Sequence, residues 1–352
     1  MRPAILFLVC VLQFGTYFAY DAPASLNIQL QKYLGLEYAE WQFVLGQLFV
    51  MYSLPNTFLP FFGGKLTDRF GCRLVLLFFC LATLTGQVMV NIGLFVKEVK
   101  LVLLVLDAFT SKMGSIANAF LSPLIDRHFG IEVAIMGPTI AYPTPSNLSH
   151  LPYEFWIVCT TFILFTGPYY CFNNTALDFL VSKYYPNDTV SAGFAMSVPM
   201  TVSTSLLTVS GTTLSTSTHS KSIYLVFSFL AITAVHIFLG FTALSPIVPF
   251  IALGTAGAIN LTLMYPFVNH VIRRHEARAV ESVSMLGMAY GVCVCLQNVV
   301  LVVIPLCVAW ILTNGQQDMR RWEHLELFFA SLSVLGAAGA LWLYRIEQME
   351  ID

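Results

Sequence analysis

Lys112 is a charged residue inside an apolar run, which covers about residues 101 to 124 and is long enough to cross a membrane. An ammonium in hydrocarbon costs roughly 2.5 kcal/mol or more, so this side chain should face a cavity or an acidic partner. The partner could be the carboxylate of a bound solute. It could also be an acid of the protein: Asp107 has a poor spacing for a pair on one helix, but acids on other helices are open. We predict that Lys112 binds a solute carboxylate, with a structural ion pair as the alternative.

Asp21 is a second candidate for binding a charged solute. It closes the first predicted span beside Pro23, where the chain is expected to leave the membrane. Its carboxylate could bind a solute amine or a proton. The alternative is an ordinary helix-end residue in the membrane interface.

Amide and phenol side chains form a third group of candidates. Tyr290 and Gln297 lie seven residues apart and share one helix face, and Asn298 is adjacent. Asn173 follows a Gly-Pro step that should kink its helix. Such groups suit hydrogen bonding to peptide groups, although they also serve as contacts between helices. We predict that these four residues line a solute cavity, and interhelical hydrogen bonding remains the alternative.

Neither the histidines nor the cysteines form a reactive constellation. His236 stands alone in an apolar run, so we expect a structural role for it before a proton relay. The eight cysteines lie in or beside apolar runs, and Cys293 with Cys295 has the wrong spacing for a zinc or redox pair. The sequence has no H-E-x-x-H or G-x-S-x-G motif and no paired intramembrane aspartates. We expect no enzyme activity, no metal and no cofactor.

Apolar runs dominate the elements that must position these residues. Hydrophobic residues make up 57% of the 352 and charged residues only 10%, with a mean hydropathy of +0.75. These values predict an all-α, polytopic membrane protein, and the absence of a basic patch excludes a nucleic-acid partner. Counting by apolar length predicts ten spans, at about residues 3–21, 42–62, 74–95, 101–124, 155–180, 191–212, 223–244, 247–271, 284–313 and 325–344.

A short polar loop separates the second span from the third. It reads G-G-K-L-T-D-R-F-G-C-R from Gly63 to Arg73, and its basic residues place it on the cytoplasmic side. The pattern resembles the signature between the second and third helices of the major facilitator superfamily of secondary transporters. The resemblance implies a gating motif formed by Gly64, Asp68, Arg69, Gly71 and Arg73.

Other stretches resemble one branch of this superfamily, which is described as lysosomal dipeptide transporters. They are residues 14–23, 97–115 and 287–291, with Gln297 and Asn298 following the last; Lys112 stands where the branch has a basic residue, commonly arginine. The resemblance implies alternating access, dipeptides as favoured substrate, and a lysosomal membrane location, with the plasma membrane as alternative. It also implies a glycosylated accessory membrane protein as partner, beside the lipid bilayer and the solute.

Ten spans fall short of the twelve that this superfamily has, and the fourth and sixth are the ones without a counterpart. We predict an N-terminal half of about four helices at 1–130, a central cytoplasmic linker at 131–152, and a C-terminal half of six helices at 153–352. The shortfall keeps a second hypothesis open: a truncated, non-transporting isoform or an incomplete gene model, which would act at most as a partner-binding membrane protein.

Loop parity predicts which glycosylation sequons face the lumen. Sequons occur at Asn147, Asn173, Asn187 and Asn260. Glycan transfer requires an exposed luminal loop, and only the Asn187 loop lies outside by this count. We predict glycan at Asn187 alone.

Overall fold

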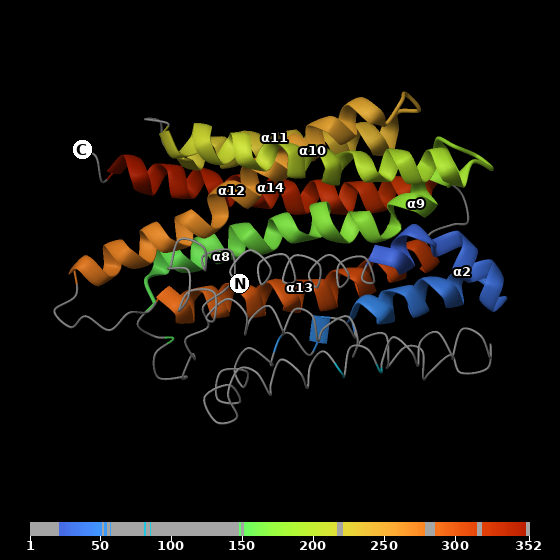
Figure 1. The fold of residues 1–352 in the computed structure, drawn as a ribbon, viewed down its shortest axis with the longest axis horizontal. Coiled ribbons are helices and arrows are strands. Elements are labelled where there is room, and N and C mark those ends of the chain that lie inside the picture. The colour runs from blue at the N-terminus through green and yellow to red at the C-terminus, as the bar shows by residue number, and fades with distance from the viewer. Residues whose placement is uncertain are drawn as a thin grey trace, which may run out of the picture. The chain divides into compact units, whose positions relative to one another are not determined.

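The computed structural model describes residues 21–50, 53, 54, 57, 81, 85, 148, 151–216, 221–278, 286–314 and 319–349. All regular structure in these ranges is helical. The named elements are α2 (Asn27–Leu34), α8 (Tyr153–Thr166), η1 (Gly167–Cys171), α9 (Phe172–Lys183), α10 (Thr189–Thr216), α11 (Lys221–Phe241), α12 (Ile247–Arg278), α13 (Leu286–Asn314) and α14 (Arg320–Met349) (Figure 1).

Six helices within the described ranges are long and apolar enough to cross a membrane. They are Tyr153–Lys183, Thr189–Leu207, Lys221–Phe241, Ile247–Ala277, Met288–Asn314 and Arg320–Met349, the first being α8, η1 and α9 in one continuous run. These six confirm the spans predicted from residue 155 onward, so the protein is an integral membrane protein with several passes. Only Leu81 and Thr85 of the predicted span at 74–95 are described, and both are helical; the predicted span at 101–124 lies outside the described residues.

The N-terminal region contains more helix than its apolar pattern predicts. Residues 21–25 are helical, α2 follows at Asn27–Leu34, and a further helix begins at Tyr38. The prediction that Asp21 closes the first helix is therefore wrong. Pro23 has a φ that a helix accepts, and it removes only one backbone donor, so the helical turn continues beyond it.

Contacts divide the described residues into two compact units. One contains residues 24–29, α8 to α12, the end of α13 from Cys307, and α14. The other contains residues 21–23, 30–50 and the start of α13 up to Leu306, together with the few further residues described before 150. The boundaries predicted for the two halves and the linker remain predictions.

Close helix contacts in the first of these units involve small residues. α11 packs along α14, α10 packs along α12, and α8 contacts α14. At Gly336 of α14, a Cβ atom would overlap the ring of Phe229 on α11, and at Gly257 of α12 it would overlap the ring of Tyr169. Glycine at both positions lets an aromatic ring lie against the neighbouring backbone, as in other membrane bundles.

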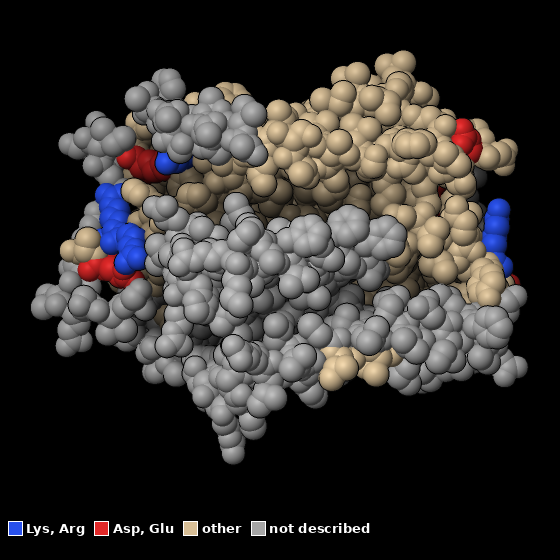
Figure 2. Space-filling model, viewed as in Figure 1, with Lys and Arg blue, Asp and Glu red and all other residues tan. Residues whose placement is uncertain are grey.

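The outer surface is apolar where lipid would contact it. Large side chains are exposed on several helices, including Phe194, Phe227, Trp310 and Trp342, which are 59 to 71% exposed. On the face shown in Figure 2, the charged atoms of the described residues gather at the two ends of the helices, and the described surface between those ends is uncharged. This distribution fits helices whose middle portions lie in hydrocarbon.

Candidate functional site

The long helix from Tyr153 to Lys183 widens at its centre. Its π-helical segment, Gly167–Cys171, falls at the Gly-Pro step where the sequence predicts a kink. The Phe172 N–H donates to the Gly167 carbonyl, five residues back, in place of the Pro168 carbonyl that it would meet in an α-helix. Pro168 O is therefore released from its usual α-helical donor and can accept from another helix.

His236 of α11 provides that donor. Its Nε2 lies 3.0 Å from Pro168 O, and its Nδ1 lies 2.6 Å from Glu326 Oε2 of α14. Both side chains are fully buried, with 0% exposed area. The second carboxylate oxygen, Glu326 Oε1, is buried and has no hydrogen-bond partner among the described residues. One histidine thus joins three helices, and its two nitrogens both face acceptor atoms.

Aromatic rings enclose this pair. The centroid of the Phe172 ring lies 5.2 Å from that of His236 at 86°, and the centroid of Phe329 lies 5.3 Å away. Phe172 also meets Phe250 of α12 edge to face, at a centroid distance of 6.1 Å. Such rings exclude water, so among the described residues the pair has only its own members and Pro168 O as hydrogen-bond partners.

Lys183 and Tyr184 cover the end of α11 next to this pair. Lys183 Nζ donates to the carbonyls of Leu239 and Gly240, the latter at 2.7 Å, and Tyr184 Oη donates to Leu239 O at 3.2 Å. These bonds satisfy carbonyls that a helix C-terminus leaves without intrahelical donors. Burial, together with the negative charge of Glu326, raises the pKa of Tyr184 to about 12, so the phenol keeps its proton at physiological pH.

Glu326 is a site residue that the sequence did not predict. It lies inside the last predicted span, 325–344, and His236 was expected to be a lone structural histidine. A partial signal was present for His236, which is a single ionisable residue inside an apolar run and so should pair with another polar group. Glu326 stands at the start of its run, close to Glu323 and His324, where an acid is ordinary. The separation of 90 residues along the chain gives no local spacing by which to match them.

The polar candidates on α13 lie on one helix, as predicted. Tyr290 and Gln297 are both partly buried, and Asn298 is 5% exposed. Asn298 Nδ2 donates to the carbonyl of Val294 on the same helix, at 2.8 Å. This bond uses one amide proton and leaves Oδ1 as the group that could accept from a solute.

Two other candidates are in the described residues. Asn173 follows the π segment by two residues and is partly buried, whereas Asn174 is 4% exposed with Nδ2 unpartnered among the described residues. Asp21 is also partly buried. Lys112 and the residues of the gating motif, Gly64, Asp68, Arg69, Gly71 and Arg73, lie outside the described residues.

The sequons differ in exposure. Asn187 is exposed in the loop between α9 and α10 with a φ of 70°, a conformation that asparagine tolerates. Asn260 is fully buried, and its Nδ2 donates to Ser228 Oγ at 2.6 Å. Next to Asn187, the hydrogen bonds of Ser191 lower the pKa of the exposed Asp188 carboxylate, which caps α10.

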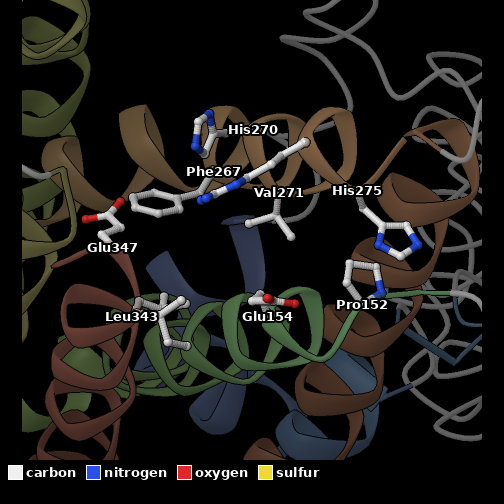
Figure 3. Close-up of a pocket in the computed structure, with 10 residues that line it drawn as sticks. Pro152, Glu154, Phe267, His270, Val271, His275, Leu343 and Glu347 are labelled. Atoms are coloured by element: carbon white, nitrogen blue, oxygen red, sulfur yellow. The ribbon is translucent and has the colours of Figure 1, made fainter. Parts of the chain in front are cut away.

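A small pocket opens at the other end of these helices. It encloses about 50 Å³, with Glu154 from α8, His275 from α12 and Glu347 from α14 in its lining (Figure 3). His270 and Arg274 of α12 complete its ionisable lining. The volume holds a few waters and is too small for a dipeptide. Among the described residues, no group of three His, Cys, Asp or Glu side chains could hold a metal ion.

Solved structures of known transporters share the arrangement of helices. The nucleoside transporter NupG superposes with a TM-score of 0.63 at 13% identity, covering 97% of this chain and 98% of its own. The chain has the major facilitator superfamily fold. A bacterial homologue of the human lysosomal transporter Spinster, in an inward-facing and occupied conformation, gives a TM-score of 0.57 at 12% identity, covering 98% of this chain and 97% of its own.

Sequence relatives extend over nearly the whole chain. The lysosomal dipeptide transporter MFSD1 of Bos taurus is 24% identical over 433 residues, covering 99% of this chain and 86% of the relative, and that of Danio rerio is 24% identical over 425 residues, covering 98% and 87%. MFSD1 of Mus musculus is 40% identical over 93 residues, which cover 26% of this chain and 19% of the relative. No protein-family model matches the chain. These findings confirm the predicted resemblance to a branch of major facilitator transporters.

Proposed function

We propose that this major facilitator protein carries dipeptides across the lysosomal membrane by alternating access. The observation that carries the proposal is the similarity along 98 to 99% of the chain to proteins named lysosomal dipeptide transporters. A plasma membrane location is the alternative. The fold supports a transporter in general and does not select the solute.

The candidate residues suit the chemistry of a free dipeptide. Lys112 would bind its carboxylate and Asp21 its amine, because both termini of a dipeptide are charged at neutral pH. Tyr290, Gln297, Asn298 and Asn173 would bond its peptide group and side chains. The gating motif, from Gly64 to Arg73, would control access from the cytoplasmic side between the proposed halves, 1–130 and 153–352.

Uptake into proteoliposomes tests this proposal. Free dipeptides should enter, whereas C-terminally amidated dipeptides should not, because a blocked terminus cannot form the charge-assisted bond to Lys112. Losing such a partner typically costs about 2 to 5 kcal/mol, a factor of roughly 30 or more in affinity. Lys112→Ala should remove the discrimination and Lys112→Arg should retain it. Equal uptake of free and amidated dipeptides by the unmodified protein would reject the carboxylate role of Lys112.

A second candidate function is that of a non-transporting membrane protein that binds a partner, such as a glycosylated accessory protein. The match to the Bos taurus relative extends over 433 positions and this chain has 352 residues, so the relative carries segments without a counterpart here. If the chain moves no dipeptide while a version with the two absent helices restored does, this second function replaces the first.

A further inference from the structure

We propose that His236 and Glu326 form a proton-binding site, and that the bound proton holds the π-helical segment Gly167–Cys171 in place. The inference goes beyond the transport of any particular solute, since it concerns how one helix of the bundle responds to pH. It rests on the distances from the histidine ring to its two neighbours and on the geometry of the π segment.

The histidine contacts require a bound proton. A neutral imidazole carries one N–H, yet His236 faces an acceptor on each side, Pro168 O at 3.0 Å and Glu326 Oε2 at 2.6 Å. A carbonyl oxygen can only accept, so Nε2 must carry its hydrogen. The short contact between Nδ1 and Oε2 then also needs a proton, held either as imidazolium with carboxylate or as imidazole with carboxylic acid. In both forms the pair has no net charge.

Releasing this proton removes one of the two hydrogen bonds. The pair then consists of a neutral imidazole and a carboxylate, with a net charge of −1, and only one N–H remains to be shared. A hydrogen bond to a carboxylate is roughly twice as strong as one to a neutral carbonyl. The remaining hydrogen therefore moves to Nδ1, and Nε2 faces Pro168 O as a second acceptor.

Proton release thus breaks the hydrogen bond that supports the π segment. The Phe172 N–H already donates to Gly167 O, so the Pro168 carbonyl is left with neither its α-helical donor nor the His236 donor. Reversion to α-helical hydrogen bonding would restore the first of these donors. Removing a one-residue bulge would turn the following residues by about 100° around the helix axis. Asn173 and Asn174 would turn with them.

The charged surroundings decide how the pair responds to pH. Lys183 at the end of α9 and the adjacent Tyr184 lie at the end of α11, and the positive charge of Lys183 acts on both Glu326 and Glu323 of α14. α12 presents Phe250 to this aromatic cluster, and its ionisable residues begin only at Tyr265. Among the described residues, Lys183 is thus the cation that compensates the carboxylate when the proton leaves.

The reactivity of Cys171 measures the state of the π segment. This thiol ends the segment and is 1% exposed, and Cys159 of α8 is equally buried but lies outside the segment. The purified full chain would be treated with N-ethylmaleimide from pH 5 to 9, and alkylation at each cysteine counted by mass spectrometry. The ratio of Cys171 to Cys159 cancels the ordinary effect of pH on thiols. It should rise about fivefold toward pH 9, the change expected for losing roughly one hydrogen bond.

Three variants separate the proton site from a merely structural pair. Glu326→Gln reproduces the proton-loaded hydrogen bonds without a titrating group, because its amide N–H can donate to Nδ1; its ratio should stay low at every pH. His236→Ala should give a high ratio at every pH. Glu323→Gln is the matched control, a carboxylate on the same helix without contact to His236, and should behave as the unmodified protein.

Two outcomes overturn the proposal. A Cys171 to Cys159 ratio in the unmodified protein that stays constant from pH 5 to 9 would show that the pair holds its proton throughout, and this result needs no variant. A ratio that rises with pH in Glu326→Gln as much as in the unmodified protein would assign the response to another group.

Discussion

Two groups of histidine and glutamate residues lie near opposite ends of α14 and differ mainly in burial. Near its start, Glu326 and His236 are fully buried, 2.6 Å apart, inside a shell of aromatic rings. Near its end, Glu347 lines a small pocket with Glu154 and His275, where all three side chains are partly exposed. Water can screen and solvate the second group, whereas the first depends on its own hydrogen bonds.

The comparison implies that replacing the same residue type lowers the stability of the protein far more at the start of α14 than at its end. Removing one member of a buried pair leaves an uncompensated charge or polar group, while removing one from a hydrated pocket leaves it to water.

Replacing one histidine from each group gives the most direct test. His236→Ala should lower the free energy of unfolding by about 3 to 5 kcal/mol, because it leaves Glu326 buried without its partner. His270→Ala removes an exposed side chain at the pocket and should change the free energy of unfolding by no more than about 0.5 kcal/mol. Tryptophan fluorescence during denaturation in detergent would compare both with the unmodified protein. Similar losses for the two variants would contradict the role given to burial.

Gly336 lies on α14 between the two groups and tests how far the tight packing extends. Gly336→Ala should destabilise the protein by about 1 to 3 kcal/mol, since its Cβ would overlap the ring of Phe229. Gly193→Ala on α10 is the matched control, because its Cβ would meet open space. The Gly193→Ala variant should be as stable as the unmodified protein or more stable by up to about 1 kcal/mol, because alanine has the higher helix propensity. The same change in melting temperature for the two variants would show that α11 and α14 can move apart without loss of stability.

Asp188 extends the comparison to a fully exposed carboxylate. Its folded-state pKa lies below the ordinary value of 3.8, because Ser191 donates to it. Its contribution to stability is therefore present above pH 3.8 and is lost as the pH falls through the lower, folded-state value. Lowering the pH from 5 to 2 should reduce the melting temperature slightly more in the unmodified protein than in Asp188→Asn. A larger decrease in melting temperature from pH 5 to 2 in Asp188→Asn than in the unmodified protein would contradict this assignment.

Glycosylation at Asn187 would establish which group of residues faces the lumen, with little effect on stability. Asn187→Gln should remove the mobility shift that glycosidase treatment produces, because this exposed asparagine lies in the loop beside Lys183. Asn260→Gln is the control and should leave the shift unchanged, since its side chain is buried. Glycan elsewhere, for example at Asn147, would invert the predicted orientation.

The membrane spans of the C-terminal region could be predicted from the sequence because length and hydropathy alone specify them. The helical conformation of residues 21–25 could not, because proline is compatible with either a helix end or a kinked continuation. The Gly-Pro step before Asn173 predicted a distortion. Its π-helical form leaves the Pro168 carbonyl to a side chain 68 residues away, at His236.

The candidate site shows the same division between local and long-range information. The common helix of Tyr290 and Gln297 follows from their spacing, and the bond from Asn298 to Val294 is local. The pairing of His236 with Glu326 depends on the packing of α11 against α14. No periodicity within either helix encodes that packing, so this part of the site required the structure.

The His236 pair also has a consequence for synthesis of the protein. His236 leaves the ribosome 90 residues before Glu326, which at about 5 to 20 residues per second is a delay of roughly 5 to 18 s. Throughout that interval α11 carries a histidine without its partner, so it cannot settle into its final packing until α14 has been made. A nascent chain released before Glu326 would retain this unpaired group in the membrane, which gives quality-control machinery a feature by which to distinguish incomplete copies.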